Sequence, residues 1–262
     1  MWRAPEFSAD LLSRVEDAGL NASAPPQQRW VDGWLLRYSP GKAKRARCVN
    51  AVAAGRMPIE HKLAQCEAVF RAAGLPMVVR ITPFSQPPDL DGRLAALGMH
   101  RIDDTRVMVL ASLATIASEA PLPAGWRCEP VQPDAYAATV GTWRESPAAQ
   151  QAAHAERLRL SPVPYQGFVL RAAAGSVAAC AQFTLEGDLV GLYDVFVSPP
   201  QRGQGLASAL CAHLLRLAQE QGAGTAYLQV DADNHAARRV YHRLGFADGY
   251  AYHYRSAVPS LS

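Results

Sequence analysis

The sequence predicts an α/β protein (α+β in its arrangement) made of two similar units, each a mixed, mostly antiparallel sheet flanked by helices. Two observations indicate this class. The order helix, strand, helix, strand occurs twice along the 262 residues, which is the first sign of an internal repeat. In the second unit the turn Glu186-Gly187-Asp188 joins two apolar strands as a hairpin, so the sheet there is not wholly parallel.

The boundary between the units is expected in a segment of small residues and prolines, from Ala111 to Gly125. A stretch with no strong hydrophobic period is typical of an inter-domain connection. We therefore expect a first domain over residues 1–115 and a second over residues 116–262.

In the first unit, a glycine or a Leu-Gly pair follows each predicted helix. Helices are expected over residues 59–73 and 90–97, and strands over residues 77–81 and 106–110. The segment before the first helix contains Gly55 but no second glycine at close spacing. This unit therefore has the scaffold of the repeat without a glycine-rich loop.

In the second unit, a long amphipathic helix is the strongest signal. Its apolar face carries Leu206, Leu210, Leu214 and Leu217, and it is expected to end near Gly222 or Gly224. The remaining elements are helices over residues 134–143, 146–160 and 235–244, and strands over residues 126–129, 168–172, 177–185, 188–197, 225–230 and 250–255. We expect Ser146 and Asn234 to cap their helices, with Pro147 at the first helical position.

The loop before the long helix has the character of an anion site. It reads Arg202-Gly203-Gln204-Gly205 and follows an apolar strand that ends at Ser198-Pro199-Pro200. Two glycines let consecutive backbone amides turn inward, and the helix N-terminus behind them favours negative charge. The spacing matches neither a P-loop nor a dinucleotide fingerprint. Taken alone, a Gly-x-Gly pair fits a plain structural turn equally well.

The loop and a later segment, residues 234–246, resemble two motifs of the GNAT (GCN5-related N-acetyltransferase) superfamily. The first is the acetyl-CoA signature Arg/Gln-x-x-Gly-x-Gly/Ala, matched by Arg202-x-x-Gly205-x-Ala207. The second is matched by Asn234-x-x-Ala237-x-x-x-Tyr241-x-x-x-Gly245-Phe246. The resemblance covers residues 126–255. Over the first half only the order of elements is similar, so the chain resembles a tandem member with a degenerate first copy.

The resemblance implies a site for acetyl-CoA, carried over by position. The edge of the strand Val195-Phe196-Val197, splayed from its neighbour, would pair with the pantetheine amides, and one of its own amides would polarise the thioester carbonyl. Asn234 would contact the pantetheine arm. The pyrophosphate would be held by the backbone amides of Arg202, Gly203, Gln204, Gly205, Leu206 and Ala207 and by the Ser208 hydroxyl.

Transfer of an acetyl group to an amine also needs a proton donor for the leaving thiolate and a base for the ammonium. Tyr241 is the candidate donor, since it lies about two helical turns from Asn234 on the same face. The alternative is a core aromatic residue that anchors the Leu-Gly-Phe turn. Asp194 is the leading candidate base, because strand alternation places it on the face of Phe196 and opposite Tyr193 and Val195. The alternatives to that role are a structural carboxylate at Asp194, a path through water, and the nearby Asp231 and Asp233.

The acceptor pocket is expected between the first helices of the second unit and its final strands. That placement brings in Trp143, Arg144, Tyr250 and Tyr252, whose aromatic walls suit a small organic amine and also suit a protein core.

Composition excludes several other classes. A net charge of +3 is too small to indicate nucleic-acid binding, and the basic cluster of Lys42, Lys44, Arg45 and Arg47 is typical of a solvated turn between strands. The five cysteines are scattered without a Cys-x-x-Cys pair, and His213, His235 and His242 have no partner at ligand spacing, so no metal is expected. The sequence shows no leader and no apolar run long enough to span a membrane, which predicts a cytoplasmic protein.

The sequence therefore predicts an N-acetyltransferase that moves acetyl from acetyl-CoA to a primary amine of a small molecule, by direct attack in a ternary complex, in a monomer or homodimer. Two alternatives remain open: a non-catalytic acyl-CoA binding or sensor protein, and a modifier of protein lysines.

Overall fold

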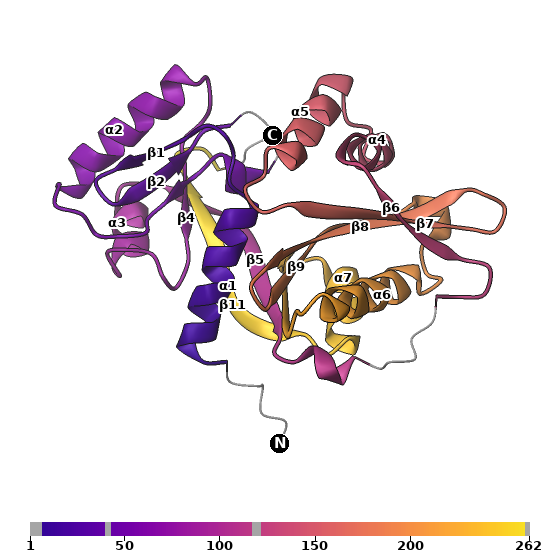
Figure 1. Ribbon diagram of the computed structural model, residues 1–262. Coiled ribbons are helices and arrows are strands. Elements are labelled where there is room, and N and C mark those ends of the chain that lie inside the picture. The colour runs from indigo at the N-terminus through magenta and orange to yellow at the C-terminus, as the bar shows by residue number, and fades with distance from the viewer. Residues whose placement is uncertain (1–6, 40–42, 117–121, 260–262) are drawn as a thin grey trace. The chain divides into compact units, whose positions relative to one another are not determined.

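The computed structural model describes residues 7–39, 43–116 and 122–259 (Figure 1). The described chain is a mixture of helices and strands, which confirms the predicted α/β class. It forms two compact units whose segments interleave: unit 1 is Met1–Ala22, Val107–Val230 and Asn234–Gly249, and unit 2 is Ser23–Arg106, Asp231–Asp233 and Tyr250–Ser262. Part of the expected linker, residues 117–121, lies outside the described residues. The predicted division at residue 115 stays a prediction, and these units cross it at both ends of the chain.

The sheet of unit 1 is mixed, as the hairpin predicted. Strands β6 to β9 pair antiparallel in chain order, and β9 pairs parallel with β10. The strand β5, which enters unit 1 at Val107, follows β10. The strands are β5 (His100–Leu110), β6 (Arg127–Val131), β7 (Tyr165–Arg171), β8 (Val177–Glu186), β9 (Leu189–Val197) and β10 (Thr225–Asp231).

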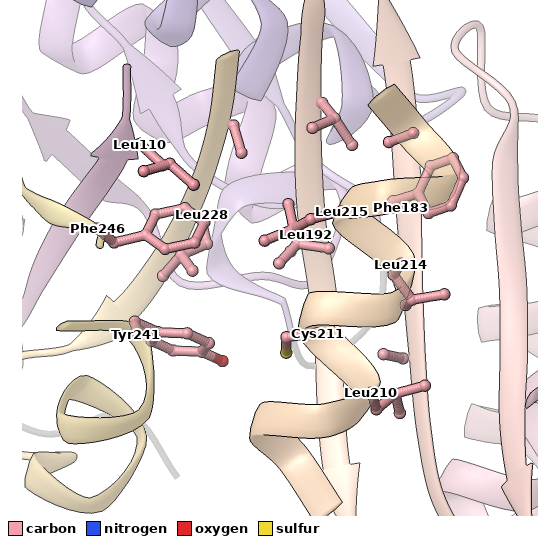
Figure 2. Close-up of a cluster of buried hydrophobic side chains, with 14 of the residues drawn as sticks. Leu110, Phe183, Leu192, Leu210, Cys211, Leu214, Leu215, Leu228, Tyr241 and Phe246 are labelled. Carbon is pink, nitrogen blue, oxygen red and sulfur yellow. The ribbon is translucent and has the colours of Figure 1, made fainter. Parts of the chain in front are cut away.

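Helices cover both faces of this sheet (Figure 1). On one face lie α4 (Pro133–Trp143) and α5 (Ala148–Arg159), and on the other α6 (Leu206–Glu220) and α7 (His235–Arg243). The helix α1 (Ala9–Ala22) packs against β9. Figure 2 shows the core beneath α6, where Leu210, Leu214 and Leu215 are fully buried against strand residues such as Phe183 and Leu192.

The two predicted helix caps had different outcomes. The side chain of Asn234 accepts a hydrogen bond from the amide of Ala237 at 3.1 Å, so that cap is confirmed. The predicted cap at Ser146 was wrong. Pro147 occupies the cap position with extended backbone angles, and the Ser146 amide instead donates to the carbonyl of Gly141 in the preceding turn.

Unit 2 has a shorter sheet with the order β1-β2-β3-β4-β11. Its first strands pair antiparallel, β3 pairs parallel with β4, and β11 pairs antiparallel with β4. Its own core contains Trp34, Leu36 and Phe70. The elements are β1 (Gln28–Val31), β2 (Trp34–Arg37), β3 (Val49–Asn50), α2 (Ile59–Ala72), β4 (Val78–Ile81), α3 (Leu90–Ala96) and β11 (Ala247–Ser256).

The two units share one connectivity. In unit 2 the crossover β3-α2-β4 joins parallel neighbours after an antiparallel meander, and in unit 1 the crossover β9-α6-β10 does the same. The strand that follows the crossover in each sheet comes from the other half of the chain, since β4 is followed by β11 and β10 by β5.

Candidate active site

The strands β9 and β10 part at the middle of the sheet of unit 1. Their parallel pairing runs from Leu189 opposite Thr225 to Leu192 opposite Leu228 and ends there. The residues of β9 that pair with β10 are buried, and the residues from Asp194 to Val197, which come after the pairing ends, are half-buried. The edge over Val195–Val197 is therefore splayed from its neighbour, as expected, and can accept an added strand.

A β-bulge lies at the point of separation. Gln182 of β8 is opposite Tyr193 and Cys180 is opposite Phe196, so Asp194 and Val195 together face the single residue between them. Asp194 is the extra residue, with φ +48°. The bulge makes the strict alternation of our prediction wrong at one position. Tyr193 packs against Tyr165, which belongs with Phe196 to the cluster on the α4 face, so Tyr193 does not oppose Asp194.

The glycine loop forms a turn at the N-terminus of α6. Gly203 has φ +80° and Gly205, the cap residue, has φ +76°, so both need the conformational freedom of glycine. The Ala209 amide donates to the Gly205 carbonyl, which leaves the amides of Leu206, Ala207 and Ser208 at the open end of the helix. Residues Arg202 to Gly205 are not buried. The geometry fits an anion cradle open to solvent.

The side chain of Arg202 folds back onto the end of β9. Its Nε donates to the carbonyl of Val197 at 3.2 Å, and its guanidinium lies 5.4 Å from the ring centre of Phe196. The side chain thus fixes the loop to the splayed strand. The Arg202 amide donates to the carbonyl of Pro199 at 3.4 Å, so the loop amides not used in this turn begin at Gly203.

Tyr241 of α7 is buried in the same core as α6 (Figure 2). Its ring packs edge-on against Phe246, and its hydroxyl points toward Cys211. Burial raises the pKa of Tyr241 well above its ordinary value, which keeps the hydroxyl protonated at neutral pH but makes it a weaker acid toward a thiolate. A protonated hydroxyl is what a donor to a leaving thiolate requires.

Asp194 lies in a polar cluster on the opposite face of the sheet. Its Oδ2 accepts a hydrogen bond from Gln182 Nε2 at 3.0 Å and lies 3.4 Å from His154 Nε2. Its Oδ1 accepts from Arg144 at 3.3 Å, and its carbonyl accepts from the Tyr136 hydroxyl at 2.9 Å. The contacts of the carboxylate all hold it as an anion.

The electrostatics of this cluster make Asp194 a weak base. Burial raises the pKa of Asp194, but the nearby His154 imidazole and the charge of Arg144 outweigh burial and hold that pKa well below its usual range. A carboxylate with a lowered pKa removes a proton from an ammonium poorly. These contacts favour the structural alternative for Asp194.

The structure brings together two of the four residues expected at the acceptor. Trp143 stacks on Phe196 with ring centres 5.8 Å apart, and Arg144 joins Phe196 to Asp194. Tyr250 and Tyr252 belong to unit 2, where Tyr250 packs on Phe84 and Tyr252 lies under Arg80.

Two members of the polar cluster, His154 and Gln182, were not predicted from the sequence. His154 is one polar residue among several on an amphipathic helix, and nothing in the pattern distinguishes it. Gln182 carried a signal, since it is the single amide in the apolar run Ala178-Ala179-Cys180-Ala181-Gln182-Phe183 and is 1% exposed.

The predicted histidines and basic cluster have ordinary surroundings. His213 Nδ1 lies 3.0 Å from Arg216, and His242 Nδ1 lies 3.1 Å from the carbonyl of Phe246. Lys44 begins a 3-10 turn between β2 and β3 and pairs with Asp103, while Lys42 lies outside the described residues. Over residues 7–39, 43–116 and 122–259 no helix has the length and hydropathy of a membrane span.

Comparison with known proteins identifies the domain that contains these features. The model of the acetyltransferase (GNAT) family matches residues 131–246, from the end of β6 through the splayed strand and the glycine loop to Phe246. The uncharacterized N-acetyltransferase YobR of Bacillus subtilis is 26% identical over 233 residues, which are 87% of this chain and 91% of that protein. Over residues 131–246 the chain has the sequence of a GNAT family domain. It is an acyltransferase, and this family uses acetyl-CoA.

Solved GNAT structures share the fold over most of the chain. A GCN5-related N-acetyltransferase from Kribbella flavida has a TM-score of 0.67 at 18% identity, covering 93% of this chain and 94% of that one. A tandem GNAT protein from the clavulanic acid biosynthesis pathway has a TM-score of 0.58 at 20% identity, covering 77% of this chain and 70% of that one. At these identities the likeness concerns the GNAT fold alone.

Proposed function

We propose that this GNAT protein transfers the acetyl group of acetyl-CoA to a primary amine of a small molecule, by direct attack in a ternary complex in the cytoplasm. One observation carries the proposal. The β9 edge opens immediately before an exposed glycine loop, and the buried Tyr241 lies on the helix α7 that follows β10.

In this proposal the donor binds mainly through backbone groups of unit 1. The amides of residues 203–207 and the Ser208 hydroxyl hold the pyrophosphate at the N-terminus of α6. The open edge of Val195–Val197 pairs with the pantetheine amides, and an amide next to the bulge donates to the thioester carbonyl. The Oδ1 atom of Asn234 is already used as a helix cap, so its Nδ2 is the group left to bind the pantetheine arm.

The chemical step exchanges one bond for another. The neutral amine nitrogen attacks the thioester carbon, the carbon–sulfur bond breaks, and the thiolate takes a proton from the Tyr241 hydroxyl. Water carries the proton of the incoming ammonium in this scheme, since the Asp194 carboxylate is held as an anion by its neighbours. Positioning of the two substrates supplies most of the rate enhancement.

A small acceptor is supported by the aromatic surroundings of the splayed strand. Trp143, Arg144 and Arg202 enclose the ring of Phe196 at the half-buried end of β9. An acceptor that approaches the thioester from this side meets an aromatic wall rather than an extended surface.

The test is a screen for release of free thiol from acetyl-CoA with amino acids, polyamines, aminoglycosides and basic peptides. We expect release with a small amine, and a Tyr241→Phe variant whose turnover falls about 10²-fold while its KM for acetyl-CoA changes little. Tyr227→Phe is the matched control, because it removes another buried hydroxyl, one that pairs with Tyr193 at 2.9 Å.

The outcomes separate the alternatives. Tight acetyl-CoA binding without thiol release for any amine would contradict the enzyme and favour an acyl-CoA sensor. Activity on peptides alone would contradict the small acceptor. Equal turnover of Tyr241→Phe and the parent would show that Tyr241 is not the proton donor.

A further inference from the structure

The turn before α2 in unit 2 already holds an anion, and that anion is the Asp32 carboxylate. The Arg56 amide donates to both carboxylate oxygens, at 3.0 and 2.8 Å, and the Met57 amide donates to Oδ2 at 2.8 Å. Gly55, which precedes these amides, has φ +73°. Consecutive amides behind a glycine with positive φ, at a helix N-terminus, are typical of a phosphate-binding turn.

A buried lysine completes the set of donors. The ammonium of Lys62, in the first turns of α2, lies 3.0 Å from Asp32 Oδ2 and is 0% exposed. It also donates to the carbonyls of Asp32 and Ala54, at 2.8 and 2.6 Å, and lies over the Trp34 ring. A buried ammonium needs an anion nearby, and here the chain itself supplies one.

A tight turn positions the Asp32 carboxylate, which fills the space beside Gly55. Asp32 and Gly33 have φ +41° and +84° and join β1 to β2 as a two-residue hairpin, for which Asp-Gly is a favoured pair. A Cβ added at Gly55 would lie 2.3 Å from Asp32 Oδ2 and 2.5 Å from Lys62 Nζ. Gly55 is therefore required for the close approach as well as for its positive φ.

This turn has the same place in unit 2 that the glycine loop has in unit 1. Each lies between the last strand of an antiparallel meander and a crossover helix, and the next strand pairs parallel with that last strand. The sequence analysis took the first copy to lack the loop. The structure shows a loop of equal length, residues 51–58 against residues 198–205, whose amides bind a carboxylate of the chain itself.

We propose that Asp32 is a built-in anion that occupies the phosphate place of unit 2, and that removal of its carboxylate opens this turn to inorganic phosphate. With Asp32 in place, unit 2 cannot take a second acyl carrier. The comparison with the carrier loop rests on the proposed function, whereas the anion site rests only on the contacts of Asp32.

The experiment compares thermal unfolding with and without inorganic phosphate at matched ionic strength. Asp32→Gly keeps a residue that accepts positive φ in the turn, but it removes the side chain that occupies the anion site. Asp32→Asn keeps the turn and a side chain of the same size in the site, but that side chain has no charge. We expect Asp32→Gly to unfold below the parent and to gain several degrees in Tm with phosphate, because a ligand that binds only the folded state raises Tm. The parent and Asp32→Asn should not respond.

The same phosphate response in the parent and both variants, or none in Asp32→Gly, would overturn the proposal. If Asp32→Gly does not fold in phosphate-free buffer, refolding followed by circular dichroism gives the same comparison. Recovery in phosphate supports the built-in anion, and failure in both buffers overturns it. Failure of the proposed function is separately visible, since it would abolish acetyl-CoA turnover in the parent without changing the phosphate response.

Discussion

Asp194 has a backbone conformation that few residues other than glycine adopt, and its side chain is fixed by groups from β8, α5 and the end of α4. The conformation turns the next amides of β9 toward the open edge, and the carboxylate contacts stabilise that conformation. The bulge could not be predicted from the sequence, because the apolar residues on both sides of Asp194 fit one continuous strand.

Replacement of Asp194 by Asn separates its structural role from the role of a base. If the carboxylate mainly fixes the bulge, we expect a loss of about 1–3 kcal/mol in the free energy of unfolding, as for a lost hydrogen bond to a charged group. The pH profile of kcat/KM should keep its shape. Turnover that is slowed about 100-fold or more, with unchanged stability, would instead restore Asp194 as the base. Asp231→Asn, at an exposed runner-up position, is the control.

Gly205 offers a second test at the scale of one residue. A Cβ there meets no atom within 4 Å, so Gly205→Ala adds no clash and changes only the backbone preference at φ +76°. We expect about 1 kcal/mol of destabilisation and a KM for acetyl-CoA raised about tenfold, because the amides no longer converge on the pyrophosphate. Gly175→Ala is a matched control, with φ +90° and equal space in a hairpin turn. An equal KM effect in both variants would contradict the cradle.

Among the elements, those with strong periodicity or glycine signals were predicted well. The helices α2, α3, α6 and α7 and the strands of unit 1 lie within a few residues of their expected positions. The helix α1 and the strands β1 to β3 were not predicted. The strands are short, and β3 has two residues, too few for a period to show. The separation of β9 from β10 was predicted only from the resemblance to the GNAT superfamily, since no local pattern in either strand marks the end of their pairing.

The contact between α3 and β11 predicts how unit 2 responds to acid. Asp91 accepts hydrogen bonds from Arg255 Nε at 2.7 Å and from His253 Nε2 at 2.8 Å. The hydrogen bond from Arg255, together with that from His253, lowers the pKa of Asp91 to about 2. A carboxylate whose pKa is lowered by folding stabilises the protein above its unfolded pKa, and this contribution is lost as the pH falls.

We therefore expect the stability of the parent to fall between about pH 5 and pH 2 more steeply than that of Asp91→Asn, measured by denaturant unfolding at a series of pH values. The difference between the two proteins should be largest near pH 5 and should decline toward neutral pH, because Asp91 also favours the charged form of His253. A difference that grows toward neutral pH would show that Asp91 acts by another route.

At the scale of the whole molecule, the repeat was visible in the order of elements, and the exchange of strands was not. Each half of the sequence contains every element of one copy, so the order along the chain fits two separate sheets. The pairing of β11 with β4 joins residues that are far apart in the sequence. It is accompanied by long-range side-chain contacts, such as the hydrogen bond from Arg255 to Asp91. Local propensity does not indicate which distant strand pairs with β4.

The exchanged strands make the chain a candidate for fragment complementation. A break in the segment 117–121 gives two pieces, and each piece lacks the strand that completes its own sheet. We expect either piece expressed alone to aggregate through the exposed edge of β4 or β10. The two pieces expressed together should co-purify and recover the thiol-releasing activity. Soluble, folded single pieces, judged by circular dichroism, would show that each sheet can close on its own last strand.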